Sequence, residues 1–288
     1  MFSVKPQRPS RLSGMPHKRP AAHWHNIAGQ WDQVGSPLRP CAEDQAVYAD
    51  ALSRWGGAGA PRGLILGVTP ELYHLPWPEG SHVSAMDRTQ RMIDLVWPGP
   101  RGDALCADWR DLPLETGSRD IALCDGGIIM LPYPDGHAAM VQGLARVLAP
   151  GGLCVFRLYV LPATRETPEA VLDDLLGGRI PNLNILKLRL GMAMQVRPEE
   201  GVQLSHVWEA LHQVAPDFSQ LATDIGWPLE HLLAINTYRE CPSRYYFLTL
   251  TEVCRLFCEQ PGGFQRDSIH EPTYPLGERC PLVFFRRG

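Results

Sequence analysis

Short apolar runs and amphipathic segments alternate through the first half of the chain. The apolar runs have the length and composition of strands, and they occupy residues 62–67, 81–87, 103–108, 119–127 and 153–160. Strands that are apolar on both faces are typical of a parallel sheet covered by helices on either side. Segments with helical periodicity lie before or between them, at residues 43–55, 88–97 and 137–148. The alternation predicts an α/β fold with a doubly wound, mostly parallel sheet.

The second half of the chain has a different pattern. Four amphipathic segments follow one another at 162–245 with no strand-like run between them, and we interpret this region as a helical insertion. Beyond it, Thr249 and Glu252 have the spacing of a capping box that begins a helix. Residues 263–272 and 280–287 predict an antiparallel pair of strands at one edge of the sheet. The predicted parts are a flexible N-terminal tail at 1–22, a core at 23–161, the insertion at 162–245 and the segment completing the core sheet at 246–288.

Composition narrows the classes of function. The 288 residues suffice for one large α/β domain, and the net charge of −4 gives no bulk attraction to nucleic acid or to an anionic membrane. No run approaches the length of a transmembrane helix, and the basic start of the chain lacks the apolar core of a secretory signal. Eight cysteines without a CxxC pair indicate a reducing, cytoplasmic compartment. Cys254 and Cys258 are one helical turn apart, but only His270 stands near them, so we expect no metal site.

Residues that can bind a cofactor stand where the predicted strands end. The first strand ends at Gly67, and the second ends at Asp87, whose two carboxylate oxygens can accept hydrogen bonds from a ribose diol. The third ends at Asp108 and Trp109, which offer an acceptor for an adenine amino group and an apolar cover for its ring. The fourth ends in Cys-Asp-Gly-Gly at 124–127. Because the ligand crevice of an open α/β sheet forms at its carboxyl edge, this set predicts a nucleotide-like cofactor site.

The order and spacing of these motifs resemble the class I S-adenosylmethionine-dependent methyltransferases over residues 23–160 and 246–286. The family's helix, turn and fifth strand resemble Leu-Ala-Arg-Val-Leu-Ala-Pro-Gly-Gly at 144–152 and the apolar run that follows it. The resemblance implies a seven-stranded sheet of order 3-2-1-4-5-7-6, with strand 7 antiparallel and the helical insertion between strands 5 and 6. It also implies S-adenosyl-L-methionine as the cofactor and methyl transfer to a small-molecule acceptor as the reaction.

The first loop departs from the family's Gly-x-Gly-x-Gly turn, because Gly67 is followed by Val-Thr-Pro-Glu. This sequence resembles a variant found in one branch of these methyltransferases. Thr69 can offer a hydroxyl and an N–H, Pro70 presets the first helical turn, and Glu71 stands near a helix N-terminus. S-adenosylmethionine has no phosphate, so the loop need not cradle one, and the missing glycines are tolerable. The cofactor contacts that the resemblance implies are Gly67, Val68, Thr69, Asp87, Arg88, Asp108, Trp109, Asp125 and Gly126.

The segment before the first strand has two interpretations. It resembles a segment that folds across the cofactor in members of this branch, where Arg39 can form a charge-assisted bond with the cofactor carboxylate. In the alternative, the segment only packs Trp24 and Trp31 against the sheet.

Candidates for catalysis and for acceptor recognition lie farther along the chain. Asp125, Tyr133 and His137 are the candidates for a general base, and Tyr133 and His137 are the candidate catalytic residues we carry forward. The alternative for His137 is a capping or surface role, and the alternative for Tyr133 is a place in the wall of the acceptor pocket. We expect the insertion to form a lid and the acceptor pocket. Its cations Lys187, Arg189 and Arg197 can recognise an acid or a phosphate on the acceptor, or they are solvated charges.

Three other classes of function compete with this interpretation. A nicotinamide-dependent dehydrogenase needs G-x-G-x-x-G after the first strand, and that motif is absent there. A nucleic-acid methyltransferase acting on base amino groups has Asn/Asp-Pro-Pro-aromatic at its fourth strand, where this chain has Asp-Gly-Gly. A catalytically weak, methyltransferase-like binding or scaffolding subunit stays the alternative, favoured by the altered first loop and opposed by Asp87 and Asp108. We expect a small-molecule partner, no nucleic acid and no membrane, and leave a homodimer open.

Overall fold

Seven strands form one sheet whose order follows from the alternation of strands and helices. The computed structural model of the chain describes residues 24, 27–29, 31–260 and 263–288, and the tail predicted at 1–22 lies outside them. The strand order is β3-β2-β1-β4-β5-β9-β8, with the first five strands parallel and β9 antiparallel to both of its neighbours. This topology confirms the predicted sheet and its antiparallel seventh strand. The strands are β1 (Arg62–Leu66), β2 (His82–Asp87), β3 (Ala104–Cys106), β4 (Arg119–Asp125), β5 (Leu148–Arg157), β8 (Phe264–His270) and β9 (Leu282–Arg287).

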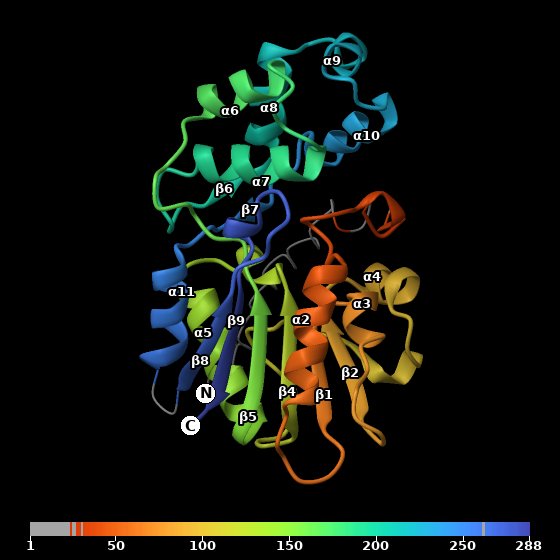
Figure 1. Cartoon of the computed structure of the whole chain (residues 1–288), viewed down its shortest axis with the longest axis vertical. Coiled ribbons are helices and arrows are strands. Elements are labelled where there is room, and N and C mark those ends of the chain that lie inside the picture. The colour runs from red at the N-terminus through yellow and green to blue at the C-terminus, as the bar shows by residue number, and fades with distance from the viewer. Residues whose placement is uncertain (1–23, 25–26, 30, 261–262) are drawn as a thin grey trace, which may run out of the picture.

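Helices cover both faces of the sheet, as apolar parallel strands require. On β1, Leu64 and Leu66 belong to one buried cluster and Ile65 to another, because successive side chains point to opposite faces. The Ile65 cluster includes residues of α2 (Ala42–Ser53), α3 (Pro70–Tyr73) and α4 (Gln90–Val96). The other includes residues of α5 (Asp135–Val147) and α11 (Leu250–Cys258), and α11 begins at the predicted capping box of Thr249 and Glu252. Figure 1 shows these helices around the sheet.

The connection from α5 to β5 differs from the prediction of a helix exit and tight turn. α5 ends at Val147 and β5 begins at Leu148, so the Ala-Pro-Gly-Gly segment lies within the strand. The register with β4 shifts in this stretch. Gly151 has φ +76°, and a Cβ on Gly152 would lie 2.8 Å from the carbonyl oxygen of Ala149. The two glycines therefore allow an irregularity in the strand where a side chain does not fit.

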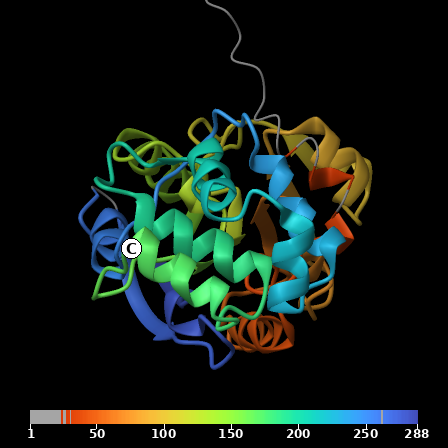
Figure 2. The ribbon, with the colours of Figure 1, turned by 90° about the horizontal axis from the view of Figure 1, so that it is seen from above.

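The insertion forms a helical cap over the carboxyl ends of the strands, as Figures 1 and 2 show. Its helices pack into the same buried cluster as β4 and β5, so the cap and the sheet share one core. The prediction of no strands in this region was wrong, because β6 (Val202–Gln203) and β7 (Arg244–Tyr245) pair as a two-residue antiparallel ladder. The helices of the cap are α6 (Pro168–Leu176), α7 (Leu183–Met194), α8 (Leu204–Val214), α9 (Phe218–Ile225), α10 (Leu229–Leu233) and the 3₁₀ helix η4 (Ala234–Tyr238).

Candidate active site

One cavity lies between the carboxyl edge of the sheet and the helical cap. It combines three regions that are far apart in the sequence: the N-terminal segment, the strand ends and the insertion. Its wall includes Trp31 and Leu38, then Gly67, Asp87, Trp109 and Gly126, and finally Leu183, Lys187, Tyr238 and Tyr245. The cavity lies at the carboxyl edge of the sheet, where the predicted topology places a ligand crevice.

The first loop lines the cavity with Gly67, Val68 and Thr69. Gly67 has φ +98°, and its N–H donates to the carbonyl oxygen of Met86 at 2.8 Å. The nearest side-chain atom to a Cβ built on Gly67 is 3.8 Å away, so this glycine is required by its backbone conformation and not by crowding. Val68 and Thr69 are buried, and Pro70 opens α3 directly after Thr69. The Val-Thr-Pro-Glu sequence thus forms a tight exit from β1 along the cavity wall.

Asp87 ends β2 and lines the cavity. Its Oδ1 accepts a hydrogen bond from the Thr89 N–H at 2.7 Å. Burial raises the pKa of Asp87 to about 6, against the opposing effects of the Thr89 hydrogen bond and the Arg88 charge. Among the described residues, no Lys, Arg or His side-chain nitrogen lies within 4.0 Å of the Asp87 carboxylate oxygens, so Asp87 forms no ion pair with them. Asp87 is therefore a desolvated acceptor that gains from donors supplied by a ligand.

Trp109 forms an aromatic wall beside Asp87. Its Nε1 donates to the carbonyl oxygen of Met86 at 2.8 Å, and the side chain is buried. A Cβ on Gly127 would lie 2.4 Å from the Trp109 ring, so glycine at this position lets the ring lie against the β4 loop. β3 ends at Cys106, two residues before the predicted end at Asp108. Asp108 lines the cavity, and the Arg110 guanidinium beside it holds the pKa of the Asp108 carboxyl below its usual range.

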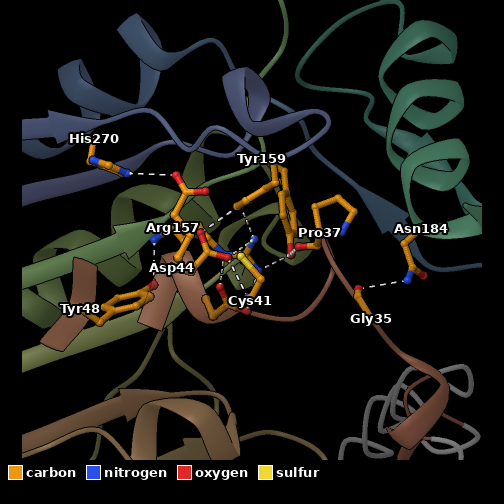
Figure 3. Close-up of polar contacts among 12 residues, drawn as sticks. Gly35, Pro37, Cys41, Asp44, Tyr48, Arg157, Tyr159, Asn184 and His270 are labelled. Carbon is orange, nitrogen blue, oxygen red and sulfur yellow. Dashed lines mark hydrogen bonds and ion pairs between the residues drawn. The ribbon is translucent and has the colours of Figure 1, made fainter. Parts of the chain in front are cut away.

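Asp125 also lines the cavity, but its carboxylate is engaged by Arg157. Arg157 ends β5, is fully buried, and binds Asp125 through both Nε and Nη2. Its Nη1 donates to the Tyr274 hydroxyl at 3.0 Å and lies 3.4 Å from Asp44 Oδ2. Figure 3 shows Arg157 beside Asp44, with Tyr159 nearby. Of the three acids at strand ends, two thus have arginine partners, and Asp87 stands apart from them.

Arg157 was not among the site residues predicted from the sequence. A signal for it existed, because Arg157 is the single charged residue in the apolar run 153–160. A charge inside a buried strand needs a partner in the fold.

The N-terminal segment crosses from the sheet to the cap along the cavity. The Tyr159 hydroxyl donates to the Pro37 carbonyl oxygen at 2.9 Å. The Asn184 amide donates to the Gly35 carbonyl oxygen at 3.0 Å, as Figure 3 shows, and the Asn182 amide donates to that of Ser36 at 3.3 Å. We call residues 34–40 the strap, because they connect the two walls.

Arg39 lies in the strap and has partners within the protein. Its guanidinium forms an ion pair with Glu71 and lies 5.3 Å from the ring centroid of Trp31. Trp24 and Trp31 line the cavity, and Arg39 is not among the residues that form its wall. The bond predicted between Arg39 and the cofactor carboxylate thus stays a prediction, and it requires that Arg39 release Glu71 or bind both groups.

The structure does not bring Tyr133 and His137 to the cavity. His137 is fully buried in the first turn of α5, with Nδ1 3.3 Å from the Pro132 carbonyl oxygen. Burial lowers the pKa of His137 to about 4. Tyr133 packs edge-on against His137, with ring centroids 5.7 Å apart. A residue that transfers a proton must reach the acceptor, so neither position supports the predicted catalytic role.

The insertion contributes the far end of the cavity. Lys187 of α7 and Tyr238 of η4 line it, and the Lys187 ammonium lies 5.0 Å from the Tyr238 ring centroid. The other two candidate cations have partners elsewhere. Arg189 forms ion pairs with Glu166 and Asp174, and the exposed Arg197 pairs with Glu200. Within the described ranges no group of three or more His, Cys, Asp or Glu residues could hold a metal ion.

These contacts fit S-adenosylmethionine as the ligand of the strand ends. The carboxylate of Asp87 can accept hydrogen bonds, Trp109 gives an aromatic wall, and Gly67 and Gly126 leave backbone exposed to the cavity. The cavity thus has the acceptor, the apolar cover and the open backbone that this molecule needs.

Comparisons with known proteins agree with this assignment. Residues 64–156 match the family model described as a methyltransferase domain. A comparison of the sequence with curated proteins gives no match. The match covers the ends of β1 to β4 and most of β5, and it supports methyltransferase chemistry with S-adenosylmethionine as the cofactor.

Several solved structures are similar to this chain, one of them with a TM-score above 0.5. A protein from Rhodobacter sphaeroides, provisionally described as a Zn-dependent alcohol dehydrogenase, superimposes with a TM-score of 0.61 at 15% identity, over 93% of this chain and 98% of that one. An S-adenosylmethionine-dependent methyltransferase from Mesorhizobium loti has a TM-score of 0.48 at 17% identity, over 86% and 98% of the two chains. One from Methanosarcina mazei has a TM-score of 0.43 at 14% identity, over 82% and 96%. None of the helices within the described ranges has the length and apolar character to span a bilayer.

Proposed function

We propose that the chain is an S-adenosylmethionine-dependent methyltransferase that acts on a small-molecule acceptor. The observation that carries the proposal is the single cavity, which has Asp87 and Gly67 at one end and Lys187 and Tyr238 at the other. The cofactor occupies the sheet end and the acceptor occupies the end beneath the cap. Both ligands then share one enclosed space, as direct transfer between them requires.

The chain's own residues hold and orient the cofactor. Asp87 accepts from the ribose, Trp109 covers the adenine, and the backbone of Gly67, Val68 and Gly126 lies along the rest of the molecule. Asp125 contributes as a fixed wall, because its carboxylate is bound to Arg157.

The protein's main task in this reaction is to align the acceptor with the methyl group of the cofactor. When bound, S-adenosylmethionine supplies a methyl group on a sulfonium that is already activated for displacement. The walls from the strap, the strand ends and the cap hold the acceptor in line and exclude water. An acceptor whose reacting atom is already deprotonated needs no general base, so the burial of His137 does not oppose the proposal.

A binding or scaffolding subunit with this fold is the second candidate. The Arg39–Glu71 ion pair favours it, because it engages the one strap cation that was predicted to meet the cofactor carboxylate. The uncompensated carboxylate of Asp87 favours the enzyme, since a fold retained only for scaffolding has no need to keep it desolvated.

Calorimetric titration distinguishes the candidates. We expect micromolar binding of S-adenosylmethionine and S-adenosylhomocysteine by the full chain, and none of NAD. Asp87→Ala removes the ribose acceptor and should abolish cofactor binding with the fold intact. Asp94→Ala removes the same charge from an exposed position on α4, and it should leave binding unchanged. Cofactor binding that survives Asp87→Ala would overturn the placement of the ribose, and no binding by the unaltered chain would favour the scaffolding candidate.

A further inference from the structure

Lys187 is unusual among the basic residues of this chain. The sequence has 27 lysines and arginines, and only Lys5, Lys18 and Lys187 are lysines. Lys187 is thus the sole lysine within the part of the chain that the structure describes, and it stands in the cavity wall. The ion pairs of the described residues otherwise use arginine or histidine as the cation, as Arg157 with Asp125 illustrates.

The surroundings of the Lys187 ammonium are aromatic and carry no counter-ion. It lies 5.0 Å from the ring centroid of Tyr238, which in turn packs edge-on against Tyr245. Among the described residues, no carboxylate oxygen lies within 4.0 Å of the Lys187 nitrogen, so Lys187 forms no ion pair with them. Burial alone lowers the pKa of Lys187 to about 8. Lys187 is half-buried, so its ammonium is partly desolvated and gains from an anionic partner.

The position of Lys187 on its helix separates it from the neighbouring cation. Arg189 is two residues away on α7, which turns its side chain by about 200° to the opposite side of the helix. There it binds Glu166 and Asp174 and joins α7 to the rest of the cap. Lys187 makes no such connection among the described residues, so a role in holding the cap together does not explain it.

Charge is divided along the cavity. The acids Asp87, Asp108 and Asp125 stand at the sheet end together with the cation Arg88, whereas Lys187 is at the cap end with Leu183 and Ala234. His231, Tyr238 and Tyr245 are the other titratable groups on the cap side of the wall. The insertion thus offers an apolar and aromatic wall whose own cation is Lys187, and Arg88 of the sheet end is near enough to interact electrostatically with Tyr245.

We propose that Lys187 binds a carboxylate on the acceptor, so that the acceptor is a small acid with an apolar or aromatic body. The inference rests on the proposed function and specifies its substrate class. The carboxylate is the counter-ion that Lys187 lacks, and the body of the acid packs against Tyr238 and the apolar cap residues. A charge-assisted hydrogen bond of this kind is among the strongest single contacts a small ligand can make.

Competitive lysine acetylation tests the proposal on the unaltered chain. Acetic anhydride reacts with the neutral amine of lysine. Mass spectrometry measures the extent of acetylation of Lys187 separately from that of Lys5 and Lys18, which serve as internal references. The probes are benzoate, phenylacetate, 3-phenylpropionate and 4-phenylbutyrate, each beside its primary amide, in the presence of S-adenosylhomocysteine. We expect at least one acid to slow the labelling of Lys187 about tenfold, because the bound anion keeps the ammonium protonated, and the matching amide to have little effect.

Several outcomes overturn the proposal. One is that an acid and its amide slow the acetylation of Lys187 equally. Another is that none of the acids slows it. A third is that Lys187 is not acetylated at any pH, because small molecules then do not reach it. Each concerns wild-type protein, so the test does not depend on the folding of a variant.

Paired variants separate this inference from the proposed function. Lys187→Met keeps a long apolar side chain and should weaken binding of the protecting acid about tenfold or more, while S-adenosylhomocysteine binds as before. Arg197→Met removes a positive charge from the surface of the insertion, and it should change neither the affinity for the acid nor the affinity for S-adenosylhomocysteine. If unaltered protein fails to bind S-adenosylhomocysteine, the proposed function fails. If it binds, and the acid binds Lys187→Met as tightly as wild type, only the role of Lys187 fails.

Discussion

The affinity for S-adenosylhomocysteine should fall in acid because of a single carboxyl group. Burial raises the pKa of Asp87 to about 6, so the group takes up a proton when the pH falls through that value. A ribose diol donates its hydrogen bonds to the ionised form. The ionised fraction is about 0.9 at pH 7 and about 0.09 at pH 5, so the dissociation constant should rise about tenfold, or about 1.4 kcal/mol.

Titration calorimetry at constant ionic strength between about pH 5 and pH 7 measures this change, with circular dichroism to show that the protein stays folded. The amino group of the ligand titrates near pH 8, above this pH range, so it stays protonated and does not contribute to the change in affinity. Asp108 stays ionised throughout, because Arg110 lowers its pKa. Asp87→Asn is the matched control, since its amide cannot titrate. It should bind more weakly and with no slope over the same range.

Two results would refute the reasoning. A flat profile for wild type would mean that the Asp87 carboxylate does not contact the ligand, or that its pKa is not raised. The same slope in Asp87→Asn would assign the effect to another group.

Other predictions concern the buried residues around the cavity. Arg157→Met leaves the Asp125 carboxylate buried without its partner and should lower the free energy of unfolding in urea by about 3–5 kcal/mol; a loss below about 1 kcal/mol would contradict the buried pair. Gly126→Ala forces a Cβ to within 2.3 Å of the Tyr159 ring at φ +64° and should lower both Tm and S-adenosylhomocysteine affinity. Gly151→Ala has similar strain at φ +76° but open space around it, so it should lower Tm alone. His137→Gln should lower Tm with turnover of bound substrate unchanged, and a lost kcat at unchanged Tm would restore the catalytic hypothesis.

The sheet was predictable because its signals are local. The five apolar runs, the capping box at Thr249 and the final pair of strands each depend on neighbouring residues, and all three appear in the structure. The placement of Asp87 at the cavity followed from topology, since parallel strands bring their carboxyl ends to one edge. Local pattern failed at the β6–β7 ladder, because two-residue strands leave no periodicity to detect.

The partners of charged residues were not predictable from the same signals. Asp125 meets Arg157 across 32 positions of sequence, and Arg39 meets Glu71 across the same separation. Such pairings depend on how distant segments pack, and the chain carries many arginines that could serve.

His137 is different, because its burial could have been anticipated. It lies four and seven residues before Val141 and Leu144, and that spacing places it on the apolar face of α5. The same helical geometry separates Lys187 from Arg189, although the sequence gives no sign of which one faces the cavity.

The strap has a consequence for how ligands enter and leave. Three hydrogen bonds, from Tyr159, Asn182 and Asn184, fasten its backbone to the two walls. At about 1 kcal/mol net for each bond, the fastening is worth about 3 kcal/mol, far less than the whole fold. The Arg39–Glu71 ion pair and the packing of Leu38 also hold the strap, so the open state is populated in fewer than about one molecule in a hundred, and opening leaves the sheet intact. We therefore expect exchange of the cofactor to proceed through brief local detachment of residues 34–40, with both the core and the cap remaining folded.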